Sequence, residues 1–305
     1  MADISALWPV IAFGSADVAL TIFVVLRRLN RYAAHDVEDT LILDQPLTKT
    51  ELAGLASKNV WKRRETADAL GRSDDPSAVQ HLILALRDPD DDVRAIAARG
   101  LGTLEAASAL DYLVSLFSDI SEASCPTVAD AVIHFGNEAH AALFTALGTG
   151  RRLADKPAYW VLRCIENIGD PTGALHVRST TCGTIGPLLT HDSPRVRAAA
   201  AAAIGRVGVP EDFVCLRPSL LDPSPEVRRQ AASAVGRIGG KDAVAMLLEA
   251  FDDPDWDVSF VASRALVQLG EKAVDSAQRL ASSATGIAYA RCLEVLDIAG
   301  RAVVL

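Results

Sequence analysis

The segment DPSPEVRRQAASAVGRIG, residues 222–239, decides the fold of this 305-residue chain. Closely similar sequences occur at three other places: DPDDDVRAIAARGLGTL at 88–104, DSPRVRAAAAAAIGRVG at 192–208 and DPDWDVSFVASRALVQLG at 253–270. A sequence that resembles itself at a regular interval predicts one small structural unit stacked many times. The four copies therefore predict the same helix in four equivalent settings.

Weaker copies align on the glycine near the end of each unit and extend the repeat over about residues 48 to 301. They are VWKRRETADALG ending at Gly71, PTVADAVIHFG ending at Gly136 and AYWVLRCIENIG ending at Gly169. Val267 and Asp297 replace the glycine in the last two units, and successive units are 30 to 36 residues apart. Eight two-helix repeats account for this spacing, with apolar partner helices such as AVQHLILAL between the copies.

Each unit has a physical logic that predicts an all-α fold. The Asp-Pro pair ends one helix and provides an acidic first turn for the next helix, where the helix dipole favours negative charge. The glycine lets the chain turn at the end of the helix, and small alanines let helices approach closely. In the sixth unit Val227, Ala231, Ala234 and Val235 share one face of the helix, and they are predicted to form the packed stripe.

The wording DPxxxVRxxAAxALGxxG resembles the HEAT repeat and, more narrowly, the HEAT-like repeats of the phycobilisome-lyase type, which occur in many bacterial proteins. The resemblance implies an armadillo-like α-α superhelix whose second helices line the concave surface. It also implies that the arginine of the VR pair binds either the aspartate six residues before it or a neighbouring repeat. Arg63, Arg94, Arg197 and Arg228 stand at this position and are interpreted as a structural ladder.

The face of the second helices opposite the packed stripe is the candidate surface for recognition. Its middle is apolar or acidic, at Ile133, Leu162 and Glu166. Arginine and tryptophan dominate the hot spots of protein interfaces, which makes a protein partner the leading hypothesis for repeats five to seven; ordinary solvated charge is the alternative. The candidate partner-binding residues are Arg206, Arg229, Arg237, Trp256, Phe260 and Arg264.

Residues 7–26, LWPVIAFGSADVALTIFVVL, are long and apolar enough to predict a membrane-spanning helix. Arg27, Arg28 and Arg31 follow directly, which predicts a single-pass protein of the inner membrane with its N-terminus outside and its solenoid in the cytoplasm. Asp17, in the middle of the segment, is a candidate for an intramembrane contact with a partner. A helix lying in the membrane interface or docked as an amphipathic helix is the alternative.

The expected organisation has three parts: a membrane anchor with its basic flank at residues 1–31, a tether at 32–47 and the HEAT-like solenoid at 48–305. The five cysteines include no Cys-x-x-Cys pair and are spread along the chain. They are interpreted as reduced, buried thiols, which favours a reducing compartment.

No sequence motif for catalysis, phosphate binding or metal binding is present, and a net charge of −9 opposes nucleic-acid binding. The chain is therefore expected to be a non-catalytic, membrane-anchored scaffold that positions a membrane-associated enzyme or signalling complex. No cofactor, metal ion or small-molecule substrate is expected. The lyase resemblance leaves a bilin-lyase-like enzyme or chaperone as the alternative.

Overall fold

The computed structural model divides the chain into two units, residues 1–45 and 46–305. The described residues all lie in the second unit, in the ranges 53–73, 75–148, 153–169, 181–209, 212–240 and 242–301. The apolar segment at 7–26 and Asp17 lie outside these ranges. Within them, no helix combines the length and the hydropathy that a membrane span requires.

The repeats predicted from the sequence are confirmed by the second helices, which follow the expected register. The regular structure of the described ranges is helical throughout. The second helices are α4 (Val60–Gly71), α6 (Asp91–Thr103), α8 (Cys125–His134), α10 (Asp155–Ile168), α13 (Pro194–Val207), α15 (Pro225–Ile238), α17 (Trp256–Gln268) and α19 (Gly286–Ile298).

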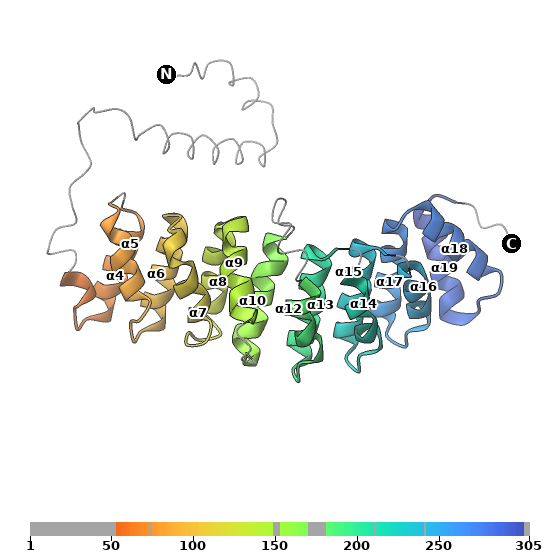
Figure 1. The fold of residues 1–305 in the computed structure, drawn as a ribbon, viewed down its shortest axis with the longest axis horizontal. Coiled ribbons are helices and arrows are strands. Elements are labelled where there is room, and N and C mark those ends of the chain that lie inside the picture. The colour runs from red at the N-terminus through yellow and green to blue at the C-terminus, as the bar shows by residue number, and fades with distance from the viewer. Residues whose placement is uncertain are drawn as a thin grey trace, which may run out of the picture. The chain divides into compact units, whose positions relative to one another are not determined.

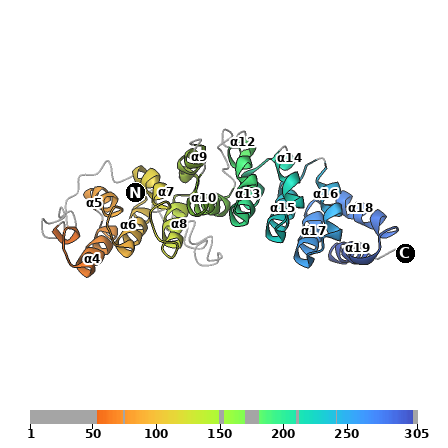
Figure 2. The ribbon, with the colours of Figure 1, turned by 90° about the horizontal axis from the view of Figure 1, so that it is seen from below.

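The first helices are shorter, and several continue into or begin with a 3₁₀ turn. They are α5 (Ser77–Ala85), η2 with α7 (Ala107–Ala109, Leu110–Leu116), η3 with α9 (Gly136–Ala139, His140–Gly148), α12 with η4 (Thr181–Ile185, Gly186–Thr190), α14 with η6 (Phe213–Leu216, Arg217–Leu221), α16 with η7 (Ala243–Glu249, Ala250–Asp252) and α18 (Glu271–Ala281). Within the second unit the hairpins follow one another in chain order, so that each second helix packs against the next (Figures 1 and 2). The described part of the chain is a solenoid of helical hairpins.

The turns before α6 and α17 supply an aspartate N-cap, as the acidic sequence predicts. The Asp90 side chain accepts a hydrogen bond from the backbone N–H of Val93, and Asp255 accepts from Val258. Pro194 and Pro225 instead occupy the first helical position, where the missing N–H costs nothing. Local sequence therefore fixes where these helices begin.

The packed stripe of the sixth repeat is confirmed, because Val227, Ala231, Ala234 and Val235 are all at most 1% exposed. Close approach between several pairs of second helices depends on a glycine. A Cβ placed on Gly236 would lie 2.5 Å from the Cβ of Ala265 in the next helix. A side chain here is excluded by the backbone of the neighbour, so the glycine sets the spacing between α15 and α17.

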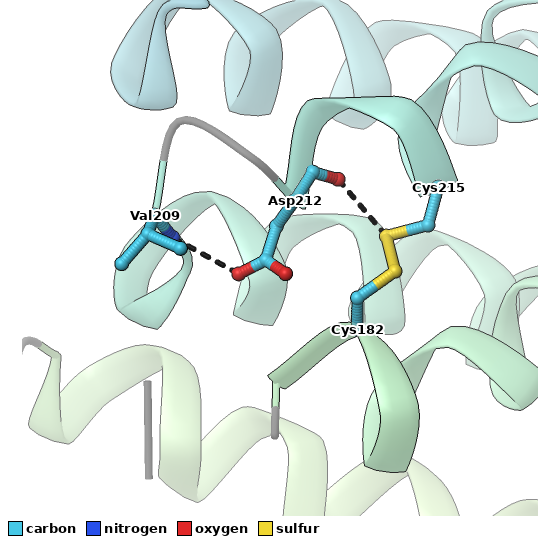
Figure 3. Close-up of a disulfide and its surroundings, with 4 residues drawn as sticks. All are labelled: Cys182, Val209, Asp212 and Cys215. Carbon is cyan, nitrogen blue, oxygen red and sulfur yellow. Dashed lines mark hydrogen bonds between the residues drawn. A yellow bond between two sulfur atoms is a disulfide. The ribbon is translucent and has the colours of Figure 1, made fainter. Parts of the chain in front are cut away.

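The expectation that all five cysteines are reduced is wrong for two of them. Cys182 in α12 and Cys215 in α14 form a disulfide between the first helices of adjacent repeats (Figure 3). Their Cα atoms lie 6.4 Å apart, within the range that a disulfide spans. The two cysteines are 33 residues apart, close to one repeat, so stacking brings them together. Cys125, Cys164 and Cys292 are buried free thiols, as expected.

Candidate partner-binding surface

Three of the four predicted ladder arginines, Arg63, Arg197 and Arg228, each bind the carboxylate of an aspartate in the next repeat. Arg94 instead pairs with Asp91 on its own helix, so the predicted ladder is incomplete there. Arg228 donates two hydrogen bonds, of 2.7 and 2.9 Å, to the carboxylate of Asp253 in the next repeat. Its third nitrogen donates to the backbone carbonyl of Asp222, six residues before it, at 2.8 Å. Arg197 repeats the arrangement with the carboxylate of Asp222. The carboxylate partner is therefore in the neighbouring repeat, and the residue six positions earlier contributes only its carbonyl oxygen.

The ladder stabilises the ionised form of its aspartates. Burial opposes ionisation of Asp222, but hydrogen bonds from Arg197 and from the N–H of Ser224 outweigh it and lower the pKa of Asp222. The same balance, with Arg228 and the N–H of Asp255 as donors, lowers the pKa of Asp253. Each arginine–aspartate pair is thus a charged contact that holds two repeats in register.

The middle repeats use a different set of contacts, since Val128 and Val161 occupy the arginine position there. Glu122, in the turn before α8, accepts hydrogen bonds from Arg195 at 2.7 Å and from the indole of Trp160 at 3.2 Å. The hydrogen bond from Arg195 is the main reason that the pKa of Glu122 is lowered. This cluster connects repeats three, four and five and was not predicted, because its members share no position in the repeat.

An aromatic patch is present on the candidate face near the C-terminal end of the solenoid. Trp256 is 61% exposed and stacks on Phe260 with ring centroids 4.9 Å apart. The guanidinium of Arg264 lies 5.8 Å from the Phe260 ring. The structure thus brings together three residues that the sequence analysis selected, all on α17.

Arg291 of α19 completes the aromatic patch and was missed by the sequence analysis. Its guanidinium lies 4.7 Å from the centre of the Trp256 ring, and it donates hydrogen bonds to Ser259 and Glu294. Ser259 stands where the three other strong copies of the repeat have the ladder arginine, and this break in the pattern was the available signal. Arg291 is only 7% exposed and holds the patch in place from below.

The four candidate arginines of this face differ in their partners. Arg229 forms an ion pair with Glu226 at 2.7 Å, one turn earlier on the same helix. Arg206 is exposed, and its Nε donates to the backbone carbonyl of Glu166 at 3.2 Å. Within the described ranges, Arg237 and Arg264 are exposed and have no hydrogen-bond or ion-pair partner. Cationic charge is therefore left unneutralised on this face.

The same face at the N-terminal end also carries arginines, but each has a carboxylate partner. Arg64 binds Asp90 through two hydrogen bonds, of 2.8 and 3.0 Å. Arg72 and Arg99 both bind Asp68, at 2.5 and 3.0 Å. They line an open groove of about 620 Å³ together with Trp61, which is 71% exposed. Trp160, in contrast, packs against Phe117.

No group of three or more potential metal-ligating side chains occurs in the part of the chain that the structure describes. The arrangement of the candidate face offers stacking surface and positive charge, which are means of binding.

A comparison with protein families agrees with this geometry: the family model for HEAT repeats matches residues 49–124 and 216–291. HEAT repeats are present in this chain. The matched stretches include the first repeats and the HEAT repeats that carry the aromatic patch. No curated protein matches the sequence.

Several solved structures resemble the HEAT-repeat unit. An engineered protein shares 20% identity with a TM-score of 0.46, and the alignment covers 81% of this chain and 77% of the other. The CpcE–CpcF complex of phycocyanin lyase from Nostoc sp. shares 24% identity with a TM-score of 0.37, covering 86% and 99%. A designed armadillo repeat protein shares 18% identity with a TM-score of 0.39, covering 72% and 99%. Likenesses this distant concern the fold alone.

Proposed function

We propose that this chain is a non-catalytic scaffold that binds a protein partner through the second helices of repeats five to seven. The observation that carries the proposal is a contrast between the two ends of the candidate face. Arg64, Arg72 and Arg99 near the N-terminal end each bind a carboxylate. Among the residues that the structure describes, Arg237 and Arg264 have no carboxylate partner, and Arg264 lies by the exposed Trp256–Phe260 stack. Exposed tryptophan and arginine are the residue types that contribute most to protein interfaces. HEAT repeats are widely used as interaction surfaces, which supports the same role.

We further propose that residues 7–26 anchor the scaffold in the inner membrane, with the N-terminus outside and the solenoid in the cytoplasm. The support is the sequence itself, a long apolar run followed by Arg27, Arg28 and Arg31. The cysteines no longer add to this argument, because a Cys182–Cys215 disulfide is unusual in a reducing compartment. Anchoring would raise the effective concentration of a membrane-associated enzyme or signalling complex near the bilayer, and Asp17 would contact it within the membrane.

Affinity capture with the full chain in a mild detergent tests the scaffold role. The charge-reversal variant Arg237→Glu with Arg264→Glu should lose the partner, because both side chains would then repel what the wild-type face attracts. Arg72→Glu with Arg99→Glu is the matched control, because it changes the same residue type on the same helix face outside the proposed interface. Equal capture by all three proteins would show that this face is not the interface.

Membrane fractionation tests the anchor separately. The intact chain should sediment with membranes and require detergent for release, and deletion of residues 1–31 should make it soluble. An intact chain that stays in the supernatant would contradict the anchor. This outcome would not contradict the proposed binding surface. Purified protein that carries a coloured tetrapyrrole would instead favour the bilin-lyase-like alternative.

A further inference from the structure

The last two second helices carry an unusual share of exposed apolar side chains. The described part of the chain exposes eight large apolar side chains, and three of them lie on α17 and α19. Trp256 of α17 is 61% exposed, and Ile287 and Ile298 of α19 are 47% and 48% exposed. The two helices pack side by side near the C-terminal end of the solenoid (Figure 2). We name Trp256, Phe260, Ile287 and Ile298 the α17–α19 face, which extends the aromatic patch onto the next helix.

The register between α17 and α19 brings these exposed side chains together. Ser263 donates a hydrogen bond of 3.2 Å to Glu294, which lies 31 residues later in the chain. Ile287 has the same offset from Trp256, so the two side chains are neighbours at the N-terminal ends of the two helices. Ile298 follows Ile287 by about three helical turns and therefore lies on the same side of α19. The exposed apolar side chains thus form one surface instead of isolated positions, and such surfaces mark interaction sites.

The charges around the α17–α19 face differ between its two ends. Arg264 lies about two turns after Trp256 on α17, is exposed, and has no carboxylate partner among the described residues. Glu294, the neighbouring carboxylate on α19, is bound by Arg291 at 2.6 Å and offers little charge to a partner. Asp257 is exposed in the first turn of α17, at the opposite end. A ligand is therefore expected to place a carboxylate over Arg264 and none over the N-terminal ends of the two helices.

A surface made of two helices favours a helical ligand over an extended one. The backbone N–H and C=O groups of α17 and α19 are bonded within each helix, so the surface offers no edge to which a strand could pair. An extended segment lying on apolar side chains would lose water from its own backbone groups without replacing it. A helix satisfies its backbone internally and presents apolar side chains at i, i+4, i+7 and i+11. These four positions cover about 16 Å, which is the length of α19 between Ile287 and Ile298.

We infer that the α17–α19 face binds an amphipathic helix of a protein partner, with its apolar stripe over Trp256, Ile287 and Ile298 and a carboxylate opposite Arg264. The inference rests on the proposed scaffold function and specifies which part of the partner is recognised. A lipid surface is less favoured, because membrane-bound helices carry several Lys or Arg residues on their polar side. Here Arg264 is accompanied by the exposed Asp257.

Fluorescence anisotropy with a designed peptide tests the inference on the full chain in neutral-lipid nanodiscs, with empty nanodiscs as the blank. The peptide is a labelled, alanine-rich helix of about 18 residues with leucine at i, i+4, i+7 and i+11. Two glutamates stand in its first turn, where they also stabilise the helix. The wild-type chain should bind the peptide, and circular dichroism should show a gain of helix on binding. A scrambled peptide of the same composition should bind at least about tenfold more weakly, and lysine in place of glutamate should weaken binding several-fold.

Two pairs of matched variants locate the apolar part of the site. Trp256→Ala should weaken peptide binding about tenfold or more, as expected for an interface tryptophan. Trp61→Ala removes the other highly exposed tryptophan, outside the α17–α19 face, and should change the affinity less than about twofold. Ile287→Asp places a charge on the face and should abolish binding, whereas Val214→Asp, at an equally exposed position of α14, should not. Both aspartates would stand in the first turn of a helix, where they are tolerated, so circular dichroism should show the wild-type fold.

A third pair isolates the charge. Arg264→Gln should weaken peptide binding about threefold, which corresponds to one exposed charge pair. Arg99→Gln changes the equivalent position of the second repeat, where the arginine already binds Asp68, and should leave the affinity unchanged.

Several outcomes would overturn the inference. They are no binding of the peptide, equal binding of the scrambled or the lysine peptide, and equal loss in a variant and its matched control. Loss of peptide binding when the nanodiscs contain anionic lipid would show that the membrane occupies the face instead. A partner captured by the chain but not displaced by the peptide would overturn the inference while leaving the scaffold role intact. Peptide binding at the α17–α19 face without any captured partner would support the site and contradict the scaffold.

Discussion

Repeats one and two share a frame with repeats five to seven but present a different surface. By frame we mean the ladder contacts and glycine contacts that join the stacked hairpins. Both regions have a ladder contact, Arg63 to Asp88 in the first and Arg228 to Asp253 in the second. Both bring second helices together at a glycine, Gly71 against Gly100 and Gly236 against Ala265. On the outer face, however, Arg72 and Arg99 of the first region bind a carboxylate, whereas Arg237 and Arg264 of the second have no carboxylate partner among the described residues.

The difference shows that the repeated sequence pattern specifies the frame, while the residues on the outer face are free to vary. Ladder residues and close-packed glycines recur at several junctions because they hold neighbouring second helices together. Asp68 lies between Arg72 and Arg99 and binds both, so one carboxylate offsets part of their charge at the N-terminal end of the face. Changes to the frame should therefore alter stability, while changes to the surface should alter binding.

Loss of the disulfide should have the largest effect on the frame of the second region. The Cys182–Cys215 bond closes a loop of one repeat, and loop-closure entropy predicts a loss of about 3–4 kcal/mol in unfolding free energy when it is removed. Urea unfolding of Cys182→Ser with Cys215→Ser should show this loss relative to the oxidised wild type. Reductant should destabilise the wild type to the level of the variant and leave the variant unchanged. A wild type indifferent to reductant would mean that the two thiols are not joined.

Placing a methyl group in the close contact between two second helices should cause the next largest loss of stability. Gly236→Ala places a methyl group against the backbone of α17, and overpacking of this kind costs about 2 kcal/mol or more. Gly183→Ala in α12 is the matched control, because a Cβ there meets no atom within 4 Å. The control should be neutral or gain up to about 1 kcal/mol from helix propensity. Thermal unfolding of both variants measures the difference, and equal Tm values would show that α15 and α17 can move apart freely.

The sequence predicted the frame well because the frame is set by local rules. Helix starts, packed stripes and glycine contacts depend on residues within one unit, and Val227 with Ala231 illustrates a stripe that was identified correctly. The partner of Arg228 was left open, since a residue 25 positions away is chosen by how two hairpins stack. The Cys182–Cys215 pair and the position of Arg291 depend on the same stacking.

The surface was only partly predictable for a related reason. Trp256, Phe260 and Arg264 are at helical spacing, so their proximity on α17 follows from the sequence. Whether an arginine is neutralised depends on carboxylates in neighbouring helices, as Asp68 and Arg99 show from 31 residues apart. No pattern within one repeat distinguishes Arg99 from Arg264, which occupies the equivalent position.

Breaking a ladder contact should lower the unfolding free energy less than filling a glycine contact does. It should lower it more than breaking a contact of the middle repeats. Asp253→Asn leaves the mostly buried Arg228 without its charged partner and should lower the unfolding free energy by about 2 kcal/mol. Glu122→Gln affects a half-exposed pair with Arg195 and should cost less than about 1 kcal/mol. Urea midpoints at equal m-values provide the comparison. A larger loss for Glu122→Gln would reverse the ranking of the two kinds of junction.

Acid should weaken the ladder in a defined direction. The pKa values of Asp222 and Asp253 are lower in the folded chain than in the unfolded chain. Their contribution to stability is therefore complete above the ordinary aspartate pKa of about 3.9 and is lost as the pH falls through the lowered folded-state values. Stability of the wild type should drop in this range, and Asp222→Asn with Asp253→Asn should show a shallower drop. Parallel curves for the two proteins would exclude the ladder as the source.

The smallest expected effect is the most direct test of the contrast between the two ends. Asp68→Asn removes the charge that neutralises Arg72 and Arg99, which are 77% and 59% exposed at the side chain. The N-terminal face would then carry free arginines near an exposed tryptophan, Trp61, as the C-terminal face does near Trp256. Because an exposed charge pair contributes up to about 1 kcal/mol, the partner of the scaffold should then also bind this face, several-fold more weakly than the C-terminal face. Quantitative affinity capture should recover more partner per chain with Asp68→Asn than with the wild type, and Glu65→Gln, which removes a neighbouring exposed carboxylate of the same groove, should leave the amount unchanged. An unchanged amount in Asp68→Asn would mean that arginine without a carboxylate partner beside an aromatic ring is insufficient for binding.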